Sequence, residues 1–576
     1  MIARRTLVAA GPLALAACRR SRRKFFTNTR PPSRQRLVYL NRDEPYTLDP
    51  ALTSMTKEVN ITRSLFEGLT SNDPVTLAPR AALATHCVFR ARETLITFYL
   101  RGSVHPRGMP LPGAEQWPAG KPALWSDGSP VTAHDFVYSW RRFIDPRTAA
   151  PFATYMYPVK NAEAISGGGS LSAKDLAVEA LDDFTFRVEL RSPVPFFLNL
   201  VAAGALAAVP RKAIEAARQS GTESSWTQPG RVVVSGPFRL HEWRPYERIV
   251  LRRNPSYYNA AAVRLEELCF IPVSDGVTNV NLFKAGEGDS MSDSVLPSQF
   301  LPALEGSEEL QVGPALDSFF YGVSVKKPPF DNPLLRYALN MAIDKQAVAS
   351  VLGAGRPAAA TYVPPMPGYR SPERLLVPFP GGNCDVLSYD PASARELLAA
   401  AGFPKGLRPN GQRFHMNFGY WFRAMSRERS EIVQHAWRRN LGIETSLAGF
   451  EPSVIPQILG SHSYEGVMEV DWQADYADPD AFLAVFTSRS STNPCGWRDE
   501  AYDAELAAAN LELDPSSRMR KLSRCEERLL RGMPLLPLFF EKWAYLQKPF
   551  VRGLQIDPLA GVSFQSTWID TNWRPQ

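Results

Sequence analysis

After its first 18 residues the chain has no apolar stretch long enough to cross a bilayer, and the remainder is too long for one hydrophobic core. A membrane-spanning helix needs about 20 consecutive apolar residues, and single cores stop growing beyond about 250–300 residues. Hydrophobic residues make up 44% of the 576 positions and charged residues 21%, which is ordinary for a globular protein. We therefore expect a globular chain of roughly two to four domains.

The N-terminus has the pattern of an export signal. Residues 1–5 are short and basic, residues 6–14 are apolar, and the small residues 15–17 precede Cys18. This pattern resembles a bacterial lipobox, so we expect residues 1–17 to be a cleaved signal peptide and Cys18 to carry lipid. An ordinary secretory signal in which Cys18 has no role is the alternative, and the pair Arg4-Arg5 leaves twin-arginine export open.

The net charge of +7 comes from the N-terminal residues. Ten of the 65 Lys and Arg lie in residues 1–36, which contain no Asp or Glu, so the rest of the chain carries 55 basic against 58 acidic residues. A body with a formal charge of −3 does not have the charge of a nucleic-acid binder. We expect residues 18–35 to form a basic tether that lies near anionic lipid headgroups.

The cysteines and histidines predict neither a metal site nor a cofactor. Beyond Cys18 five cysteines remain, and their spacing matches no CxxC or zinc pattern. One disulfide in an oxidising compartment is possible, but the sequence does not pair the cysteines. We expect no metal and no cofactor.

An acidic and aromatic segment at 469–483 is the strongest candidate for a binding site. It contains these carboxylates and rings: Asp471, Asp475, Asp478, Trp472 and Tyr476. A carboxylate enclosed by aromatic rings suits an ammonium group, because burying either charge alone costs several kcal/mol. Asp478 is expected to cap a helix whose first residue is Pro479. A solvated acidic loop is the alternative.

Short periodic segments predict a mixed α/β chain. Alternating apolar residues predict strands at 37–40, 95–100 and 184–190, and a hairpin formed by 235–240 and 247–251. An Asp-Gly turn at 127–128 leads into Thr132, which is expected to cap a helix with Phe136 and Trp140 on its apolar side. Residues 102–123 are rich in Pro and Gly, so we expect a surface loop there.

A series of blocks in chain order resembles a known family. They are LFEGL at 65–69, WSDGSPVTAHDFVYSW at 125–140, GPF at 236–238, NPSYY at 254–258, PPFDN at 328–332, RYALN at 336–340, WQADY at 472–476 and LLPLFF at 535–540. Each is similar to a segment of the extracytoplasmic oligopeptide-binding proteins that feed ABC importers, solute-binding protein family 5. The resemblance covers roughly residue 37 to the end.

The resemblance implies an α/β, two-lobed periplasmic-binding-protein-like type II fold with an additional third domain. Lobe I would comprise residues 36–68, 210–313 and 545–576, the extra domain 69–209, and lobe II 314–544. The ligand would lie between lobes that close by hinge motion. The chain would cross between the lobes near Gly313-Pro314 and Trp543-Ala544, which are the expected hinges.

The resemblance also implies ligand-binding residues. Asp475 matches the family position that binds the α-amino group of the peptide. Backbone partners for an extended peptide are expected at 52–55, which includes Ser54, at 319–323, which includes Phe320 and Tyr321, and at 468–472. The aromatic walls expected around the ligand are Trp472, Tyr476 and Phe152, the last where the family often has a tyrosine.

Departures from the family pattern leave the other end of the ligand open. Asp317 and Gln473 stand where some members have a disulfide. Glu469 stands where some members place an arginine that meets the peptide carboxylate, and Pro452 replaces an aromatic residue. A cation for that carboxylate could instead come from Arg423, Arg427 or Arg429, and a solvated helix face is the alternative for each.

The expected function is that of an extracytoplasmic, lipid-anchored, monomeric receptor. It would bind oligopeptides and deliver them to the permease subunits and associated ATPase of an ABC importer, without nucleic acid. The same fold could instead bind dipeptides, murein peptides, metal chelates, sugars or signalling peptides. A distant alternative is a serine hydrolase, since Ser54 and Lys57 have S-x-x-K spacing, but no second hydrolase motif follows.

Overall fold

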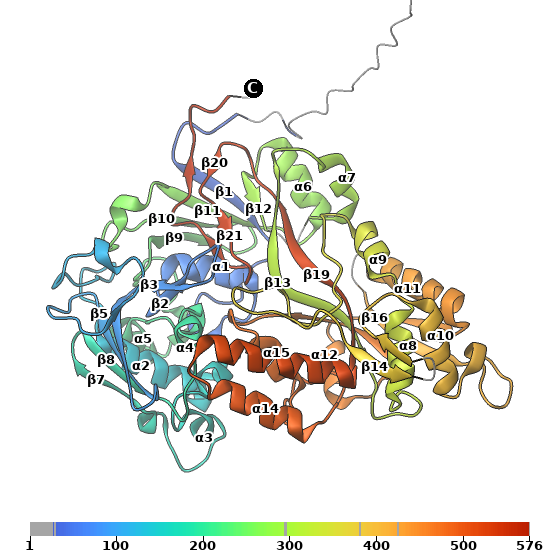
Figure 1. Cartoon of the computed structure of the whole chain (residues 1–576). Helices are drawn as coiled ribbons and strands as arrows, with labels where there is room; N and C mark the ends of the chain where they lie inside the picture. The colour runs from blue at the N-terminus through green and yellow to red at the C-terminus, as the bar shows by residue number, and fades with distance from the viewer. Residues whose placement is uncertain (1–26, 28–29, 293–295, 380–381, 423–424, 575–576) are drawn as a thin grey trace, which may run out of the picture.

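Three five-stranded β-sheets form the framework of the computed structural model, which describes residues 27, 30–292, 296–379, 382–422 and 425–574. In Figure 1 the strands β13 and β19 run through the middle of the molecule, with β1 and β9 to β11 on one side and β16 with α8 to α11 on the other. The predicted residues 1–17 and Cys18 lie outside the described residues.

The first sheet has the strand order β12-β1-β11-β10-β9. Its strands are β1 (Arg36–Asn41), β9 (Phe238–Arg244), β10 (Arg248–Arg253), β11 (Glu267–Pro272) and β12 (Ser290–Met291). β1 pairs in parallel with β11 and β12, whereas β9 and β10 form the predicted antiparallel hairpin. Leu37, Tyr39 and Leu40 are fully buried, because helices and the C-terminal hairpins cover this sheet.

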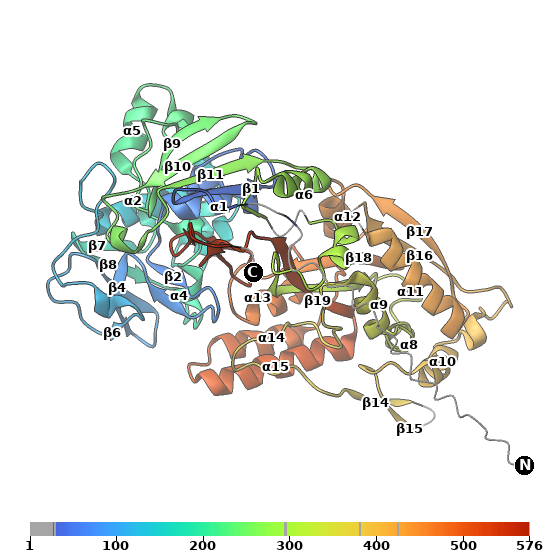
Figure 2. The same cartoon turned by 90° about the horizontal axis from the view of Figure 1, so that it is seen from above.

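The second sheet has the order β17-β16-β18-β13-β19. Its strands are β13 (Leu310–Val323), β16 (His415–Trp421), β17 (Glu444–Phe450), β18 (Val467–Gln473) and β19 (Leu535–Leu546). The long strands β13 and β19 are antiparallel, and Figure 2, which views the molecule from above, shows β19 between β1 of the first sheet and β16 of this one. Gly313 lies opposite Trp543 in their register, so the two expected hinges are neighbours.

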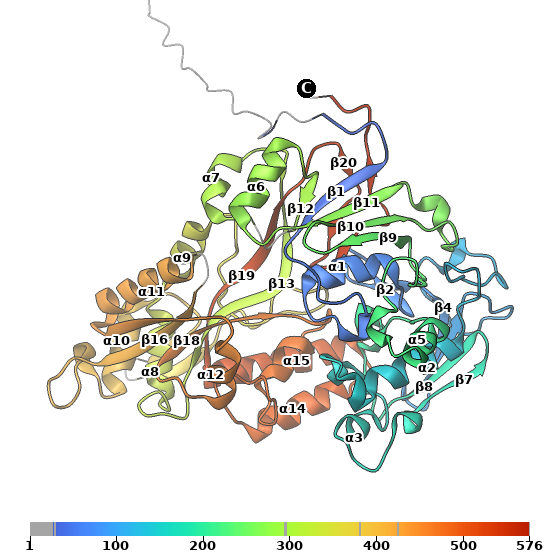
Figure 3. The same cartoon turned by 180° about the vertical axis from the view of Figure 1, so that it is seen from behind.

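The third sheet is antiparallel and has the order β6-β4-β5-β8-β7. Its strands are β4 (Ala84–Arg90), β5 (Leu95–Leu100), β6 (Met109–Pro110), β7 (Val178–Asp182) and β8 (Thr185–Glu189). Figure 3, seen from behind, shows it at the opposite end of the molecule from α10 and α11. The surface loop expected at 102–123 includes β6, which pairs with β4.

Helices cover the sheets, and short hairpins complete the fold. The helices are α1 (Thr56–Leu65), α2 (Ala133–Ile144), α3 (Ala162–Ser166), α4 (Phe197–Leu200), α5 (Arg211–Gln219), α6 (Gly276–Ala285), α7 (Leu301–Leu304), α8 (Pro333–Met341), α9 (Lys345–Leu352), α10 (Pro391–Ala400), α11 (Ser426–Leu441), α12 (Ile455–Ser461), α13 (Asp480–Leu483), α14 (Glu500–Asn510) and α15 (Pro515–Gly532). The two-stranded pairs are β2 (Thr70–Asn72) with β3 (Pro79–Ala81), β14 (Leu376–Phe379) with β15 (Gly382–Asp385), β20 (Val551–Arg552) with β23 (Trp568–Ile569), and β21 (Gln555–Ile556) with β22 (Val562–Ser563). None of the helices in the described part of the chain combines the length and apolarity that a bilayer span requires.

Two predicted helix starts had different outcomes. Thr132 is the N-cap of α2 as predicted, and Phe136 and Trp140 on that helix are fully buried. The prediction for Asp478 is wrong by one position, since α13 starts at Asp480 with Pro479 as its N-cap. Asp478 accepts a hydrogen bond from the Asp480 amide (2.9 Å), and it forms a buried ion pair with Arg518 (2.7 Å).

Candidate functional site

A cleft lies between the second sheet and loop and helix segments from other parts of the chain, among them residues 53–56 and 152–155. It consists of two adjoining cavities of about 240 Å³ and 810 Å³ that share Ser54, Met55, Thr56, Gln473 and Ala560. We call the smaller one the Asp475 cavity and the larger one the Arg429 cavity, after a residue that lines each. The shared residues form the continuous wall along which an extended ligand could lie.

Asp475 stands in the cleft just beyond the end of β18. The amide of Ala474 donates to the Leu316 carbonyl (2.8 Å), which holds this end of the chain against β13. The Asp475 side chain is accessible to solvent, although protein surrounds it on most sides in this concave site. That surrounding protein raises the pKa of Asp475 above its usual value, and a hydrogen bond from Tyr155 acts in the opposite direction.

Phe152 lines the Asp475 cavity as predicted, together with Tyr155, which the sequence analysis missed. The two rings stack with centroids 5.0 Å apart and an interplanar angle of 16°. Phe152 is the N-cap of a 3₁₀ helix at Ala153–Met156 and Tyr155 lies within it, and such a helix brings residues three apart onto one side. This spacing was the signal that could have identified Tyr155, because Phe152 was already a candidate.

Trp472 and Tyr476 do not line the cleft, which corrects the prediction that they form its aromatic walls. Asp471 and Gln473 line the Arg429 cavity, so the pleat of β18 directs Trp472 to the opposite face. The Trp472 indole donates to the Ala481 carbonyl (2.8 Å). Tyr476 stacks on Phe196 with centroids 4.5 Å apart, and its hydroxyl donates to Asp480 (2.8 Å).

Phe320 and Tyr321 are also corrections. Both side chains are fully buried, Phe320 against Tyr362 and Tyr321 against Phe418. Their backbone cannot pair with a ligand strand either, because β13 has β18 on one edge and β19 on the other over residues 318–322. A strand in the middle of a sheet has no free hydrogen-bonding edge.

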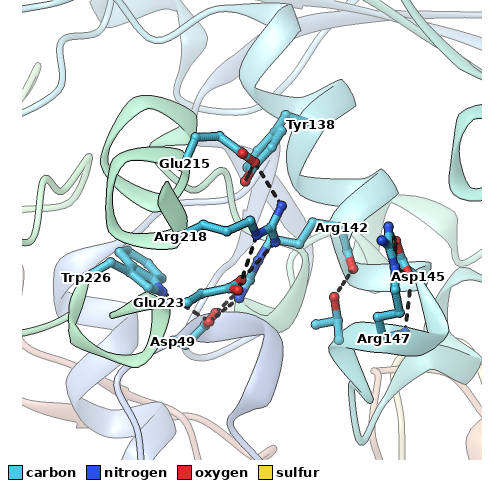
Figure 4. Close-up of polar contacts among 10 residues, drawn as sticks. Asp49, Tyr138, Arg142, Asp145, Arg147, Glu215, Arg218, Glu223 and Trp226 are labelled. Atoms are coloured by element: carbon cyan, nitrogen blue, oxygen red, sulfur yellow. Dashed lines mark hydrogen bonds and ion pairs between the residues drawn. The ribbon is translucent and has the colours of Figure 1, made fainter. Parts of the chain in front are cut away.

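Ser54 lines both cavities as predicted, in a segment held by two buried carboxylates. The Glu58 carboxylate accepts hydrogen bonds from the amides of Ser54 (2.9 Å) and Met55 (3.2 Å). Asp49 anchors the other end, where Arg142 of α2 donates to it with both terminal nitrogens, at 3.1 Å and 2.5 Å (Figure 4). The cleft wall is therefore fixed by charged contacts that lie behind it.

A further cavity of about 1020 Å³ lies on the far side of this segment, around the Asp49–Arg142 pair. Its other carboxylates are paired as well, Asp145 with Arg147 (2.6 Å) and Glu223 with Arg218 (2.8 Å), as Figure 4 shows. The three carboxylates of this cavity are therefore all engaged in ion pairs, while Arg141, Lys174 and Arg211 line it as additional basic residues. Leu52, at the start of the predicted backbone segment 52–55, lines it, whereas Asp475, Ser54 and Phe152 do not.

Of the two arginines considered for the other end of the ligand that the structure describes, Arg429 lies in the cleft and Arg427 does not. It is nearly buried in the wall of the Arg429 cavity, and its guanidinium lies 4.2 Å from the centroid of the Phe319 ring. Arg427 points to solvent, with 71% of its side chain exposed, and pairs with Glu431 (2.9 Å), so its prediction is wrong. Arg423 lies outside the described residues.

Glu469 is the buried partner of Arg429. The two groups are 3.0 Å apart, and Arg429 also donates to the Ser426 hydroxyl (3.0 Å). Arg356 and Glu541 form a second pair in the same cavity (2.6 Å). The positive charge of Arg429 in the cleft wall is therefore already neutralised by the Glu469 carboxylate.

The two positions at which some family members have a disulfide are adjacent in this fold. Asp317 and Gln473 lie directly opposite each other on β13 and β18. The five cysteines in the described part of the chain are free and buried. The register thus explains how cysteines at these two positions could join the strands, and why this chain lacks that link.

The Ser54 and Lys57 spacing does not form a hydrolase-like arrangement. Helix α1 begins at Thr56, so Ser54 precedes it and the two side chains are not one helical turn apart. The Lys57 ammonium is buried and lies 3.9 Å from the centroid of the Tyr46 ring.

Comparison with known proteins gives a consistent result. Residues 121–494 match the model of the bacterial extracellular solute-binding proteins, family 5. The chain is 31% identical to the periplasmic oligopeptide-binding protein OppA of Salmonella typhimurium over 99% of both chains.

Solved structures show the same likeness. The unliganded open form of the periplasmic murein tripeptide binding protein MppA superposes with a TM-score of 0.76, at 28% identity over 94% of this chain and 98% of that one. Haemophilus influenzae OppA in complex with the peptide RPPGFSPFR gives a TM-score of 0.71, at 27% identity over 94% and 100%. These likenesses confirm the predicted two-lobed α/β fold with an additional domain.

Proposed function

We propose, from the premise that the chain belongs to the bacterial extracellular solute-binding proteins of family 5, that it captures oligopeptides in the cleft and delivers them to the permease of an ABC importer. The observation that carries the proposal is the position of Asp475. It is a solvent-accessible carboxylate in a concave site at the end of a strand, and no salt bridge among the described residues involves it. Such a group favours a ligand with a free ammonium.

Backbone pairing would hold the rest of the peptide. Residues 53–56 and the end of β18 both line the cleft, and β18 beyond Met468 has a partner strand on one edge only. A peptide beside such an edge gains hydrogen bonds that do not depend on its side chains. Arg429 would meet the peptide carboxylate with the guanidinium donors that Glu469 and Ser426 leave available.

Binding would be coupled to closure of the two lobes. The division into lobe I (36–68, 210–313, 545–576), extra domain (69–209) and lobe II (314–544) is part of this proposal. The hinge would lie at the paired positions Gly313 and Trp543. Closure then excludes water from Asp475, which strengthens its interaction with an ammonium.

The family is extracytoplasmic, and we propose in addition a lipid anchor at Cys18 and a monomeric receptor. The permease would accept the closed form, and a separate ATPase would drive transport. We propose no catalytic role, a view supported by the positions of Ser54 before α1 and of Lys57 over the Tyr46 ring.

Calorimetric titration tests the proposal. The purified protein would be titrated with a mixed pool of tri- to pentapeptides and with the same pool after N-acetylation. We expect heat of binding from the free pool and binding weaker by about 100-fold or more from the acetylated pool. Equal binding of both pools would remove Asp475 as the anchor, and no binding of either pool would remove the peptide assignment.

A further inference from the structure

The cavity around the Asp49–Arg142 pair, here called the basic cavity, has more basic than acidic side chains in its wall. Six Lys and Arg side chains line it, against three carboxylates. Three of the six form the ion pairs already described, with Asp49, Asp145 and Glu223. The other three are Arg141, Lys174 and Arg211.

One face of α2 forms a wall of the basic cavity. The residues of α2 that line it recur at intervals of three and four, and they are His134, Val137, Tyr138, Arg141 and Arg142. Residues with this spacing lie on one side of a helix. The other side of α2 is anchored in the core by Phe136, Trp140 and Phe143, which are buried. The packing of α2 therefore fixes the direction in which Arg141 faces.

Arg141 reaches the basic cavity without a partner. It is half-buried, its Nε is shielded from solvent, and it forms no hydrogen bond or ion pair within the described residues. The next residue, Arg142, differs, since it donates to Asp49 with both terminal nitrogens. An arginine with a packed stem and unengaged terminal nitrogens keeps donors available for an anion.

Arg211 and Lys174 come from two elements that pack against α2. Arg211 is the first residue of α5, and its guanidinium lies 5.6 Å from the centroid of the Tyr138 ring of α2. Lys174 lies on the 3₁₀ helix Ala173–Asp175, which contacts α2. Neither side chain forms an ion pair in the part of the chain that the structure describes. A contact with an aromatic ring leaves the charge of Arg211 in place.

The carboxylates just outside the basic cavity are also engaged. Glu215 accepts from the Tyr138 hydroxyl (2.7 Å) and pairs with Arg218 (3.1 Å), a contact drawn in Figure 4. Asp175 does not line the cavity, and it accepts from the amide and the hydroxyl of Ser172, both at 2.8 Å. With Glu215 included, six basic side chains face four carboxylates, a formal excess of two positive charges.

We propose that the basic cavity binds a phosphate monoester, held by Arg141, Lys174 and Arg211. Such a group carries a charge of about −1.5 to −2 at neutral pH, which matches the excess. Guanidinium groups suit it, because they donate parallel hydrogen bonds to its oxygens. The volume of about 1020 Å³ leaves room for the group that carries the phosphate, in a soluble ester or in the headgroup of phosphatidic acid. The inference does not depend on the peptide assignment, since this cavity shares no lining residue with the cleft.

Calorimetric titration of the full chain with glycerol 2-phosphate tests the site, with glycerol as the uncharged control. We expect Arg141→Gln and Lys174→Gln each to weaken binding of glycerol 2-phosphate about tenfold, because each removes a charge-assisted hydrogen bond. Lys212→Gln is the matched control, since Lys212 is exposed on α5 and lies outside the cavity. It should leave binding unchanged. Lys174 is itself exposed, so its replacement does not disturb the core.

Vesicles distinguish the two sources of the phosphate. The same variants would be sedimented with phosphatidylcholine vesicles prepared with and without phosphatidic acid. The basic residues 18–35 are common to every variant, so a difference from Lys212→Gln reports the cavity. A loss confined to glycerol 2-phosphate would support the site and identify a soluble ester, and a loss confined to the vesicles would support it and identify the lipid headgroup. The proposal is overturned if Arg141→Gln and Lys174→Gln, shown to be folded by thermal unfolding, behave as Lys212→Gln does in both assays.

Discussion

Replacing Asp475 with asparagine tests the anchor most directly, because it removes the charge but keeps the shape of the side chain. An ammonium about 3 Å from the carboxylate is attracted by roughly 5 kcal/mol at an effective dielectric constant of about 20. Part of this attraction is offset, because Asp475 is accessible to solvent in the open cleft and loses water when the cleft closes. We expect a net loss of about 3 kcal/mol, which weakens binding roughly 150-fold.

The assay is calorimetric titration with one tetrapeptide in its free-amine and N-acetylated forms. Asp183→Asn is the control, since Asp183 is an exposed carboxylate outside the cleft that lies 3.5 Å from His134. The full loss is expected only for Asp475→Asn with the free-amine peptide, while the acetylated peptide should bind the wild type and Asp475→Asn alike. A loss of similar size for both peptides would mean that the substitution damages the cleft, and the charge argument would then be refuted.

Three further changes test the rest of the description. Arg429→Met should reduce the preference for a free over an amidated peptide C-terminus by about tenfold, measured by titration with both forms, whereas Arg427→Met on the exposed face of α11 should not. Arg518→Met should lower the free energy of unfolding by about 3–5 kcal/mol in urea denaturation, because it leaves the buried Asp478 without its cation, and an effect under about 1 kcal/mol would contradict that role. Burial raises the pKa of Asp289 to about 6, above its value in the unfolded chain, so the folded state binds the proton more tightly. The free energy of unfolding should therefore increase as the pH falls from 7 to 5. Asp289→Asn should remove this increase, which thermal unfolding curves recorded at both pH values would show.

Strand alternation explains which of the site residues could have been predicted from the sequence. The order of motifs was sufficient for the fold and for the place of Asp475 in the cleft. The error at Trp472 came from treating the whole segment as one wall. Neighbouring residues of a strand face opposite sides, so a cleft lined by Asp471 and Gln473 has Trp472 behind it.

The sequence could not predict whether the backbone of Phe320 and Tyr321 is free to pair with a ligand. Their strand has the same apolar composition whether it is at the edge of a sheet or in its middle, because composition reports burial and not pairing. What decides the matter is that β19, more than 200 residues later in the chain, occupies the second edge of β13. Such non-local pairing leaves no signal within the strand itself.

Charge compensation gives the two ends of the cleft different selectivity. At one end, no salt bridge in the described part of the chain involves Asp475, and Arg63, which lines the same cavity, is already paired with Asp557. The negative charge there is uncompensated, so a ligand without an ammonium leaves it unpaired on closure and binds much more weakly.

At the other end, the cation that would meet the ligand carboxylate already has a buried anion. Arg429 and Glu469 are neutral as a pair, so a ligand carboxylate gains hydrogen bonds from the guanidinium but neutralises no isolated charge. A ligand that does not reach Arg429 therefore loses less binding free energy than a ligand that leaves Asp475 unpaired. The structure therefore favours strict selection of the peptide N-terminus together with tolerance of where the C-terminus falls, which is the combination that a receptor for peptides of several lengths requires.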